Sequence, residues 1–192
     1  MGILWSFFNP VLMLIVYTFV FSIVFKARWI GGTDSKTEFA LVLFAGLMMY
    51  NLFAECINRA PGLVLGNVNY VKKVVFPLEI LPIVAIGSAT FHLIISLFVW
   101  LCFYLIFIGV PPSTIGLLPV LLFPFFLMIL GLTWLLASLG VYLRDVTQII
   151  GILTTALLFL SPIFYPISAN LKHSFSFALI LVAFSNAFYF KI

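Results

Sequence analysis

Charged residues are scarce in this chain. Asp, Glu, Lys and Arg make up 7% of the 192 residues, and hydrophobic residues make up 65%. A soluble globular domain carries about 25% charged residues, so the composition excludes an ordinary soluble domain and predicts a membrane protein. The net charge of +4 comes from basic residues scattered between apolar runs. Because they form no stripe or arm, we expect no nucleic-acid partner.

The sequence also lacks the residue patterns of an enzyme. Cys56 and Cys102 have no metal or redox spacing, and neither His92 nor His173 has a carboxylate or cysteine at metal-ligand spacing. The glycine pair in GGTDSKT, residues 31–37, lacks the G-x-x-x-x-G-K-[ST] spacing that binds phosphate. We therefore expect no catalytic residue, no metal and no cofactor in this chain.

Proton-coupled transport is disfavoured by a second absence. No carboxylate lies in the middle of an apolar run, and no inverted repeat is visible, which argues against a secondary transporter. His92 is the one ionisable residue well inside an apolar run. An interhelical hydrogen bond is favoured there over a proton relay.

Long apolar runs predict the membrane spans, each of which needs about 20 residues. Pro111–Pro112 is expected to end the third span and Pro124 to kink the fourth. SPIFYP, residues 161–166, predicts a helix end or a re-entrant turn. The predicted fold is an all-α transmembrane bundle in a single domain, residues 1–192, with spans at 5–25, 39–54, 80–110, 115–142, 146–166 and, marginally, 175–190.

The polar stretch NVNYVKKVVFP, residues 67–77, interrupts the apolar pattern. A lysine at the bilayer centre costs about 2.5–3.5 kcal/mol on insertion scales, so Lys72 and Lys73 belong at the interface or in water. Valines spaced by three and four predict a short amphipathic helix on the membrane surface, with Asn69 and Lys73 opposite them. A solvated loop near anionic headgroups is the alternative. The valines are Val64, Val68, Val71 and Val75.

Basic residues favour a cytoplasmic position for this stretch only narrowly. With the N-terminus inside, the cytoplasmic side holds Arg59, Lys72, Lys73, Arg144 and Lys191, and the outer side holds Lys26, Arg28, Lys36 and Lys172. Aromatic residues make up 18% of the chain. They predict either lipid-facing packing or an aromatic-lined path for sugars, and periodicity does not separate these alternatives.

Three blocks of sequence resemble a known family. NVNYVKKVVFPLEILP, residues 67–82, is similar to the pattern N-x-N-L-[IV]-x-K-V-x-F-P-x-E-I-L-P, with Tyr70 in place of the usual leucine. GILWSFFNPVLMLIVYTFVFSIVF resembles the first span of that family, and YLRDVTQIIGILTTALLFLSPIFYP resembles its fifth. The family is the type-2 ABC exporter permeases, in the branch that exports O-antigen, capsule and teichoic acid.

The resemblance implies roles for particular residues. A separate nucleotide-binding subunit would hydrolyse ATP and contact the chain near Arg59, Asn67, Asn69, Lys72, Lys73 and Phe76. A path at a homodimer interface would be lined by Trp5, Phe8, Tyr17, Phe164 and Tyr165. Glu79, Arg144 and Asp145 would mark the cytoplasmic boundary. The implied location is the bacterial inner membrane, in contact with its lipids.

The sequence departs from the family pattern in two places, and these differences are the reason for an alternative hypothesis. Family members carry a basic amphipathic segment before the G-x-L-W block, whereas this sequence starts at Met1–Gly2. The family's Asn-Pro-rich segment and last span are not recognisable in LKHSFSFALILVAFSNAFYFKI. We expect a shortened permease subunit that exports lipid-linked polysaccharide. The alternative is a non-transporting permease fragment or a small membrane scaffold.

Overall fold

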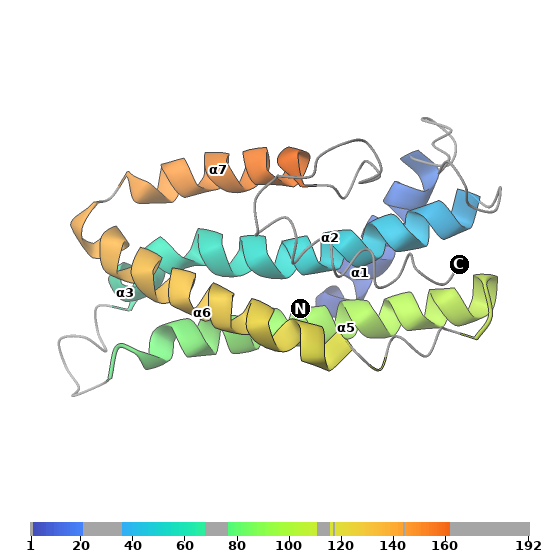
Figure 1. The fold of residues 1–192 in the computed structure, drawn as a ribbon, viewed down its shortest axis with the longest axis horizontal. Helices are drawn as coiled ribbons and strands as arrows, with labels where there is room; N and C mark the ends of the chain where they lie inside the picture. Colours follow the sequence, from blue (N-terminus) through green and yellow to red (C-terminus); the bar gives the residue numbers. More distant parts are fainter. Residues whose placement is uncertain are drawn as a thin grey trace. The chain divides into compact units, whose positions relative to one another are not determined.

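The computed structural model describes residues 2–20, 36–67, 77–110, 116, 118–143 and 145–161 (Figure 1). Within these ranges the regular elements are all helices. They are α1 (Gly2–Phe19), α2 (Lys36–Arg59), the 3-10 helix η2 (Ala60–Gly62), α3 (Leu63–Gly66), α5 (Ile80–Phe107), α6 (Leu118–Tyr142) and α7 (Val146–Leu160). The predicted all-α fold class is therefore confirmed for the described part of the chain.

The chain forms two compact units. Unit one contains α1, residues 36–50 of α2 and residues 92–107 of α5. Unit two contains residues 51–59 of α2, η2, α3, residues 80–91 of α5, α6 from Val120 onward, and α7. The single domain expected from the sequence stays a prediction, and each unit is described by itself below.

Two described helices, α5 and α6, are long and apolar enough to cross a membrane. Only 28% of the apolar window in α5 and 24% of that in α6 is buried. Both helices therefore present most of their apolar side chains outward, as lipid-facing helices do and the core helices of soluble proteins do not. The described apolar parts of α1 and α7 are shorter, and the predicted number of spans stays a prediction.

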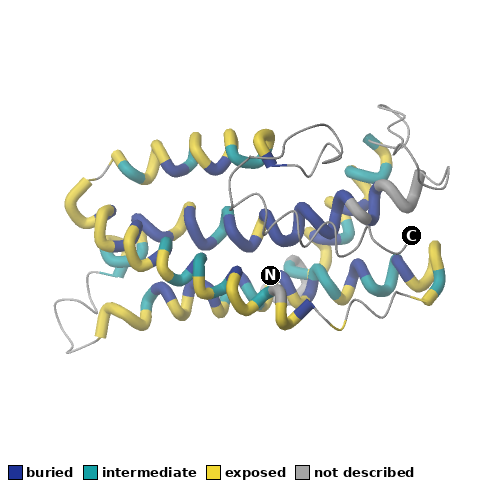
Figure 2. Tube along the Cα trace, in the orientation of Figure 1, coloured by how far each residue is buried: buried dark blue, intermediate teal, exposed yellow. Residues whose placement is uncertain are grey.

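The core of unit one is the first half of α2. Every residue from Leu43 to Tyr50 is buried, which gives the continuous dark blue stretch of α2 in Figure 2. The indole of Trp100, on α5, donates a hydrogen bond to the backbone carbonyl of Leu41 over 2.9 Å. Its ring also packs at a tilt against Tyr104, with centroids 5.1 Å apart. An apolar helix enclosed in this way needs no polar face.

The end of α5 differs from the prediction. The sequence predicted a helix to Val110, ended by Pro111–Pro112, but α5 ends at Phe107. Gly109 has a φ of 109°, a left-handed conformation that glycine adopts without strain. Its N–H donates to the carbonyl of Tyr104 over 3.1 Å, which satisfies one of the last carbonyls of the helix. The two prolines lie outside the described residues.

The turn between α6 and α7 is short. The backbone carbonyl of Asp145 accepts hydrogen bonds from the N–H groups of Gln148 and Ile149, at 3.1 and 3.2 Å. Asp145 therefore occupies the N-cap position of α7, where an acidic residue also interacts favourably with the helix dipole. Pro10 and Pro124 lie inside α1 and α6, and both helices continue past the proline.

Candidate functional site

The predicted docking region begins at the end of α2. Residues 58–62, here called the corner, carry the chain from α2 into η2. Arg59 keeps helical angles (φ −78°, ψ −26°), and Pro61 stands in the first turn of η2, where a missing N–H costs nothing. Ala60 and Pro61 are buried, whereas Asn58, Arg59 and Gly62 are exposed. The corner therefore has a buried backbone and an exposed polar rim.

The surface helix predicted across Val64 to Val75 does not form as one continuous helix. The helix α3 ends at Gly66, and Asn67 has non-helical angles (φ −116°, ψ 34°). The Asn67 side chain donates its Nδ2 hydrogen to the carbonyl of Leu63 over 2.8 Å, capping the short helix from within. Asn69, Lys72, Lys73 and Phe76 lie outside the described residues, so their predicted role stays a prediction.

Arg59 in the corner forms an ion pair with Glu55, one turn earlier on the same face of α2. Arg59 Nη1 lies 3.1 Å from Glu55 Oε1, and the two side chains are 50% and 31% exposed. An exposed pair at this spacing stabilises a helix by only about 0.3–0.5 kcal/mol, so its value is charge at a surface. The thiol of the neighbouring Cys56 has a raised pKa of about 12. Burial is the largest cause, the negative charge of Glu55 adds to it, and the positive charge of Arg59 acts in the opposite direction.

The corner lies directly against α6. A Cβ atom built on Gly140 would lie 2.2 Å from the Pro61 carbonyl oxygen and 2.6 Å from its Cα. Those separations are far below van der Waals contact, and both neighbouring atoms are backbone. Only glycine therefore allows the last turns of α6 to meet η2 at this distance.

The corner also reaches α7, with which η2 is in contact. Thr154 is 4% exposed, and its hydroxyl lies 3.1 Å from Asn58 Oδ1. The same hydroxyl lies 3.0 Å from the carbonyls of Ile150 and Gly151 in its own helix. Since a hydroxyl has one hydrogen, these acceptors share it.

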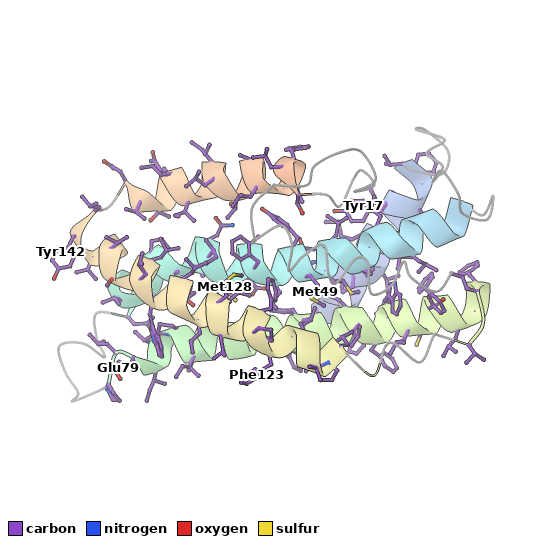
Figure 3. The ribbon with its side chains drawn as sticks, in the orientation of Figure 1. Tyr17, Met49, Glu79, Phe123, Met128 and Tyr142 are labelled. Atoms are coloured by element: carbon purple, nitrogen blue, oxygen red, sulfur yellow. The ribbon has the colours of Figure 1, made fainter. Side chains whose placement is uncertain are left out.

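The cytoplasmic boundary predicted from sequence is partly described. Glu79 is exposed, and its backbone carbonyl accepts a 3.1 Å hydrogen bond from the indole of Trp134 on α6. Figure 3 shows Glu79 and Tyr142 at the end of unit two that carries α3. Tyr142 is 84% exposed at the last residue of α6, a position typical of an interfacial anchor. Asp145 is exposed, and Arg144 lies outside the described residues.

The aromatic residues predicted to line a path do not share one face of α1. Tyr17 follows Phe8 by about two and a half helical turns, which places the two side chains on opposite faces. Phe8 is 55% exposed, and Tyr17 is half-buried. Trp5 lies on α1, but its side chain is outside the described part, as are Phe164 and Tyr165. Among the described residues, only Phe8 presents its ring outward at a predicted path position.

Sequence reasoning missed the residues that hold the corner. Gly140 and Asn58 lie outside the three quoted blocks. Thr154 lies within the third block, but a glycine or threonine in an apolar helix is ordinary. A short polar residue next to Arg59 was the one available signal, and it does not name a partner on α7. The described residues contain no group of three or more His, Cys, Asp or Glu that could hold a metal.

Comparison with known proteins gives a consistent family. Residues 1–189 match the family described as ABC-2 type transporter. The chain is similar to the O-antigen export system permease protein RfbA of Myxococcus xanthus, at 27% identity over 168 residues, or 88% of this chain and 62% of the relative. A protein of the same name from Klebsiella pneumoniae is 24% identical over 166 residues, 85% of this chain and 61% of the relative. The chain thus spans about three fifths of the length of these relatives.

Proposed function

The chain belongs to the ABC-2 type transporter family, and from this premise we propose that it is the membrane subunit of an ATP-driven polysaccharide exporter. The match over residues 1–189 is the observation that carries the proposal. The relatives named as O-antigen export permeases support a lipid-linked polysaccharide as the cargo. Two long apolar helices with mostly outward-facing side chains support a position in the membrane, here the bacterial inner membrane with several spans.

A separate nucleotide-binding subunit supplies ATP hydrolysis in this proposal. The sequence has no G-x-x-x-x-G-K-[ST] motif of its own. Residues 58–79, here called the docking segment, present the surface to which that subunit binds. Support comes from the exposed Arg59 and from the three-residue element η2, whose Pro61 is buried and anchors the segment. Lys72 and Lys73 add positive charge within the segment.

The cargo path is proposed at the interface of a homodimer. Phe8 is the described aromatic that fits this role best, because its ring is exposed on α1. Flat aromatic rings offer apolar surfaces to sugars without strong polar contacts, which suits a path that must release its cargo. ATP-driven closure of the ATPase subunits would move the docking segments and so shift the helices that line the path.

Binding and export together test the proposal. The tagged chain is co-expressed with the ATPase of its own system in cells whose permease has been deleted. We expect the ATPase to co-purify and surface polysaccharide to return. A chain that inserts stably but neither binds the ATPase nor restores the polymer would contradict the proposal and favour a non-transporting scaffold.

Charge reversal then tests the docking segment. Changing Lys72 and Lys73 to Glu should weaken ATPase association while membrane insertion stays near the wild-type level. Changing Lys26 and Arg28 to Glu, on the expected outer side, is the charge-matched control. Equal ATPase binding by both double variants would remove the lysines from the docking surface.

A further inference from the structure

The docking segment is attached to α6 near both of its ends, and both attachments lie within unit two. Near its start, Pro61 lies against Gly140, which has no room for a Cβ atom. At its end, the Glu79 carbonyl accepts a hydrogen bond from Trp134 Nε1 over 3.1 Å. Because no space separates Pro61 from Gly140, a movement of the corner toward α6 must displace α6.

The bond between the corner and α7 is of a different kind. The Thr154 hydroxyl can give its hydrogen to Asn58 Oδ1 or to the carbonyls of Ile150 and Gly151, which lie at almost the same distance. Because either choice leaves this buried hydroxyl bonded, the link to Asn58 can break and form without leaving an unsatisfied group. The exposed side chain of Asn58 can turn to water when the link is broken. The Asn58–Thr154 contact therefore has two arrangements, and each leaves the Thr154 hydroxyl hydrogen-bonded.

We propose that Gly140 and Thr154 are positioning residues that couple the corner, at the start of the docking segment, to α6 and α7. The contact at Gly140 is steric and transmits movement of the corner to α6. The bond at Thr154 is releasable and joins α7 to the corner in one of two arrangements. An element with two discrete arrangements, biased by a partner at one end, is the physical requirement for coupling between sites. This inference rests on the proposed function, since it assumes that an ATPase binds the docking segment.

The chain offers a matched control for the variant at each position. Gly140→Ala places a methyl group against the Pro61 backbone, whereas Gly131→Ala adds one on the same helix with nothing within 4 Å. Thr154→Val removes the hydroxyl that reaches Asn58 and keeps the shape of the side chain. Thr155→Val removes a hydroxyl that bonds only to the Gly151 carbonyl among the contacts described, at 2.9 Å.

Each variant is measured in complex with the ATPase, for ATPase binding, ATP hydrolysis and surface polysaccharide in permease-deleted cells. We expect Gly140→Ala and Thr154→Val to lower the polymer exported per ATP hydrolysed by about fivefold, with ATPase binding retained. Gly131→Ala and Thr155→Val should match the wild type. A purely structural role would lower binding, hydrolysis and export together and leave the ratio unchanged.

The outcomes separate this inference from the proposed function. If the wild-type chain does not bind the ATPase, the proposed function fails before any variant is compared. If it binds and exports, an unchanged ratio for Thr154→Val overturns the coupling role of α7. Should Gly140→Ala fail to accumulate, Trp134→Phe tests the second contact with α6, because it removes the hydrogen bond to the Glu79 carbonyl. A wild-type ratio in Gly140→Ala, or in Trp134→Phe where Gly140→Ala does not accumulate, overturns the coupling role of α6.

Discussion

Trp100 and Leu41 join two helices of unit one through a buried hydrogen bond. The indole Nε1 of Trp100 donates to the Leu41 carbonyl oxygen over 2.9 Å, and each residue is only 1% exposed. The bond reaches a backbone atom, so it depends on the position of α2 and not on the identity of the Leu41 side chain. It defines the register of α5 against the buried stretch of α2.

Replacing Trp100 by Phe should therefore destabilise the protein. The variant loses the indole hydrogen bond, and the smaller ring leaves a buried cavity. We therefore expect the free energy of unfolding to fall by about 1–3 kcal/mol. Thermal unfolding of the purified protein in detergent, followed by circular dichroism, measures the change.

Trp134→Phe is the matched control for this prediction. Trp134 also donates its indole hydrogen to a backbone carbonyl, that of Glu79, but its side chain is 42% exposed. Water can replace the lost bond there, so the loss of stability should be well below that of Trp100→Phe. Equal losses for the two variants would show that burial of Trp100 contributes nothing.

The buried thiol of Cys56 should resist alkylation in the folded protein. Cys56 is 0% exposed and lies beyond residues 39–54, the second predicted span. Burial raises its pKa from the ordinary 9.0 to about 12, and the thiolate is the reactive form. In Cys102→Ala, which leaves Cys56 as the one cysteine of the chain, a water-soluble maleimide at pH 8 should label only after denaturation. Rapid labelling of the native variant would contradict this burial.

The same pKa shift predicts a pH dependence of stability. The folded state favours the neutral thiol. Its contribution to the free energy of unfolding is therefore complete below the unfolded pKa of about 9, and it is lost as the pH rises toward the folded pKa of about 12. Unfolding measured across this alkaline window should become easier in the wild type. Cys56→Ala should remove that part of the decline, which separates it from the titration of other groups.

The fold was predictable where apolar runs are long. The predicted spans at 80–110 and 115–142 contain α5 and α6, because a run of that length has few alternatives to a helix. The helix ends were less predictable. The prediction placed the end of α5 at Pro111–Pro112. The helix ends earlier, at Phe107, and Gly109 then adopts a left-handed φ of 109°. Backbone angles of this kind depend on local hydrogen bonds, which periodicity does not report.

The candidate site was predictable in chemistry but not in contacts. Charge and polarity predicted a surface stretch in this part of the chain, and Arg59 is exposed there. Its role in docking stays a prediction. The valine spacing predicted a continuous helix, but α3 ends at Gly66 after one turn, and Asn67 has non-helical angles. The roles of Gly140 and Thr154 were not predicted, because these residues contact Pro61 and Asn58, which are far away in sequence. Such pairs follow from tertiary packing, which a single sequence does not contain.

Charge reversal at Arg59 should weaken ATPase binding without unfolding the chain. Arg59→Glu replaces an exposed ion pair by two like charges, which costs about 0.5 kcal/mol at this spacing. Glu55→Gln breaks the same pair and keeps the positive charge, so it is the control. We expect ATPase co-purification to fall for Arg59→Glu alone, and more strongly at low salt, where surface charges are less screened. A similar fall for Glu55→Gln would assign the effect to the ion pair instead of to the positive surface.

Phe8 and Tyr17 should respond in opposite ways to truncation, because they lie on opposite faces of α1. Phe8 is 55% exposed, so Phe8→Ala should change the free energy of unfolding by no more than about 0.5 kcal/mol. It should nevertheless alter surface polysaccharide if its ring lines the path. Tyr17 is half-buried, and Tyr17→Ala should lower stability by about 1–3 kcal/mol, with export falling only as far as protein abundance falls.

Export normalised to the amount of membrane-inserted protein distinguishes the effects of Phe8→Ala and Tyr17→Ala. A normalised value that stays at the wild-type level for Phe8→Ala would remove Phe8 from the path.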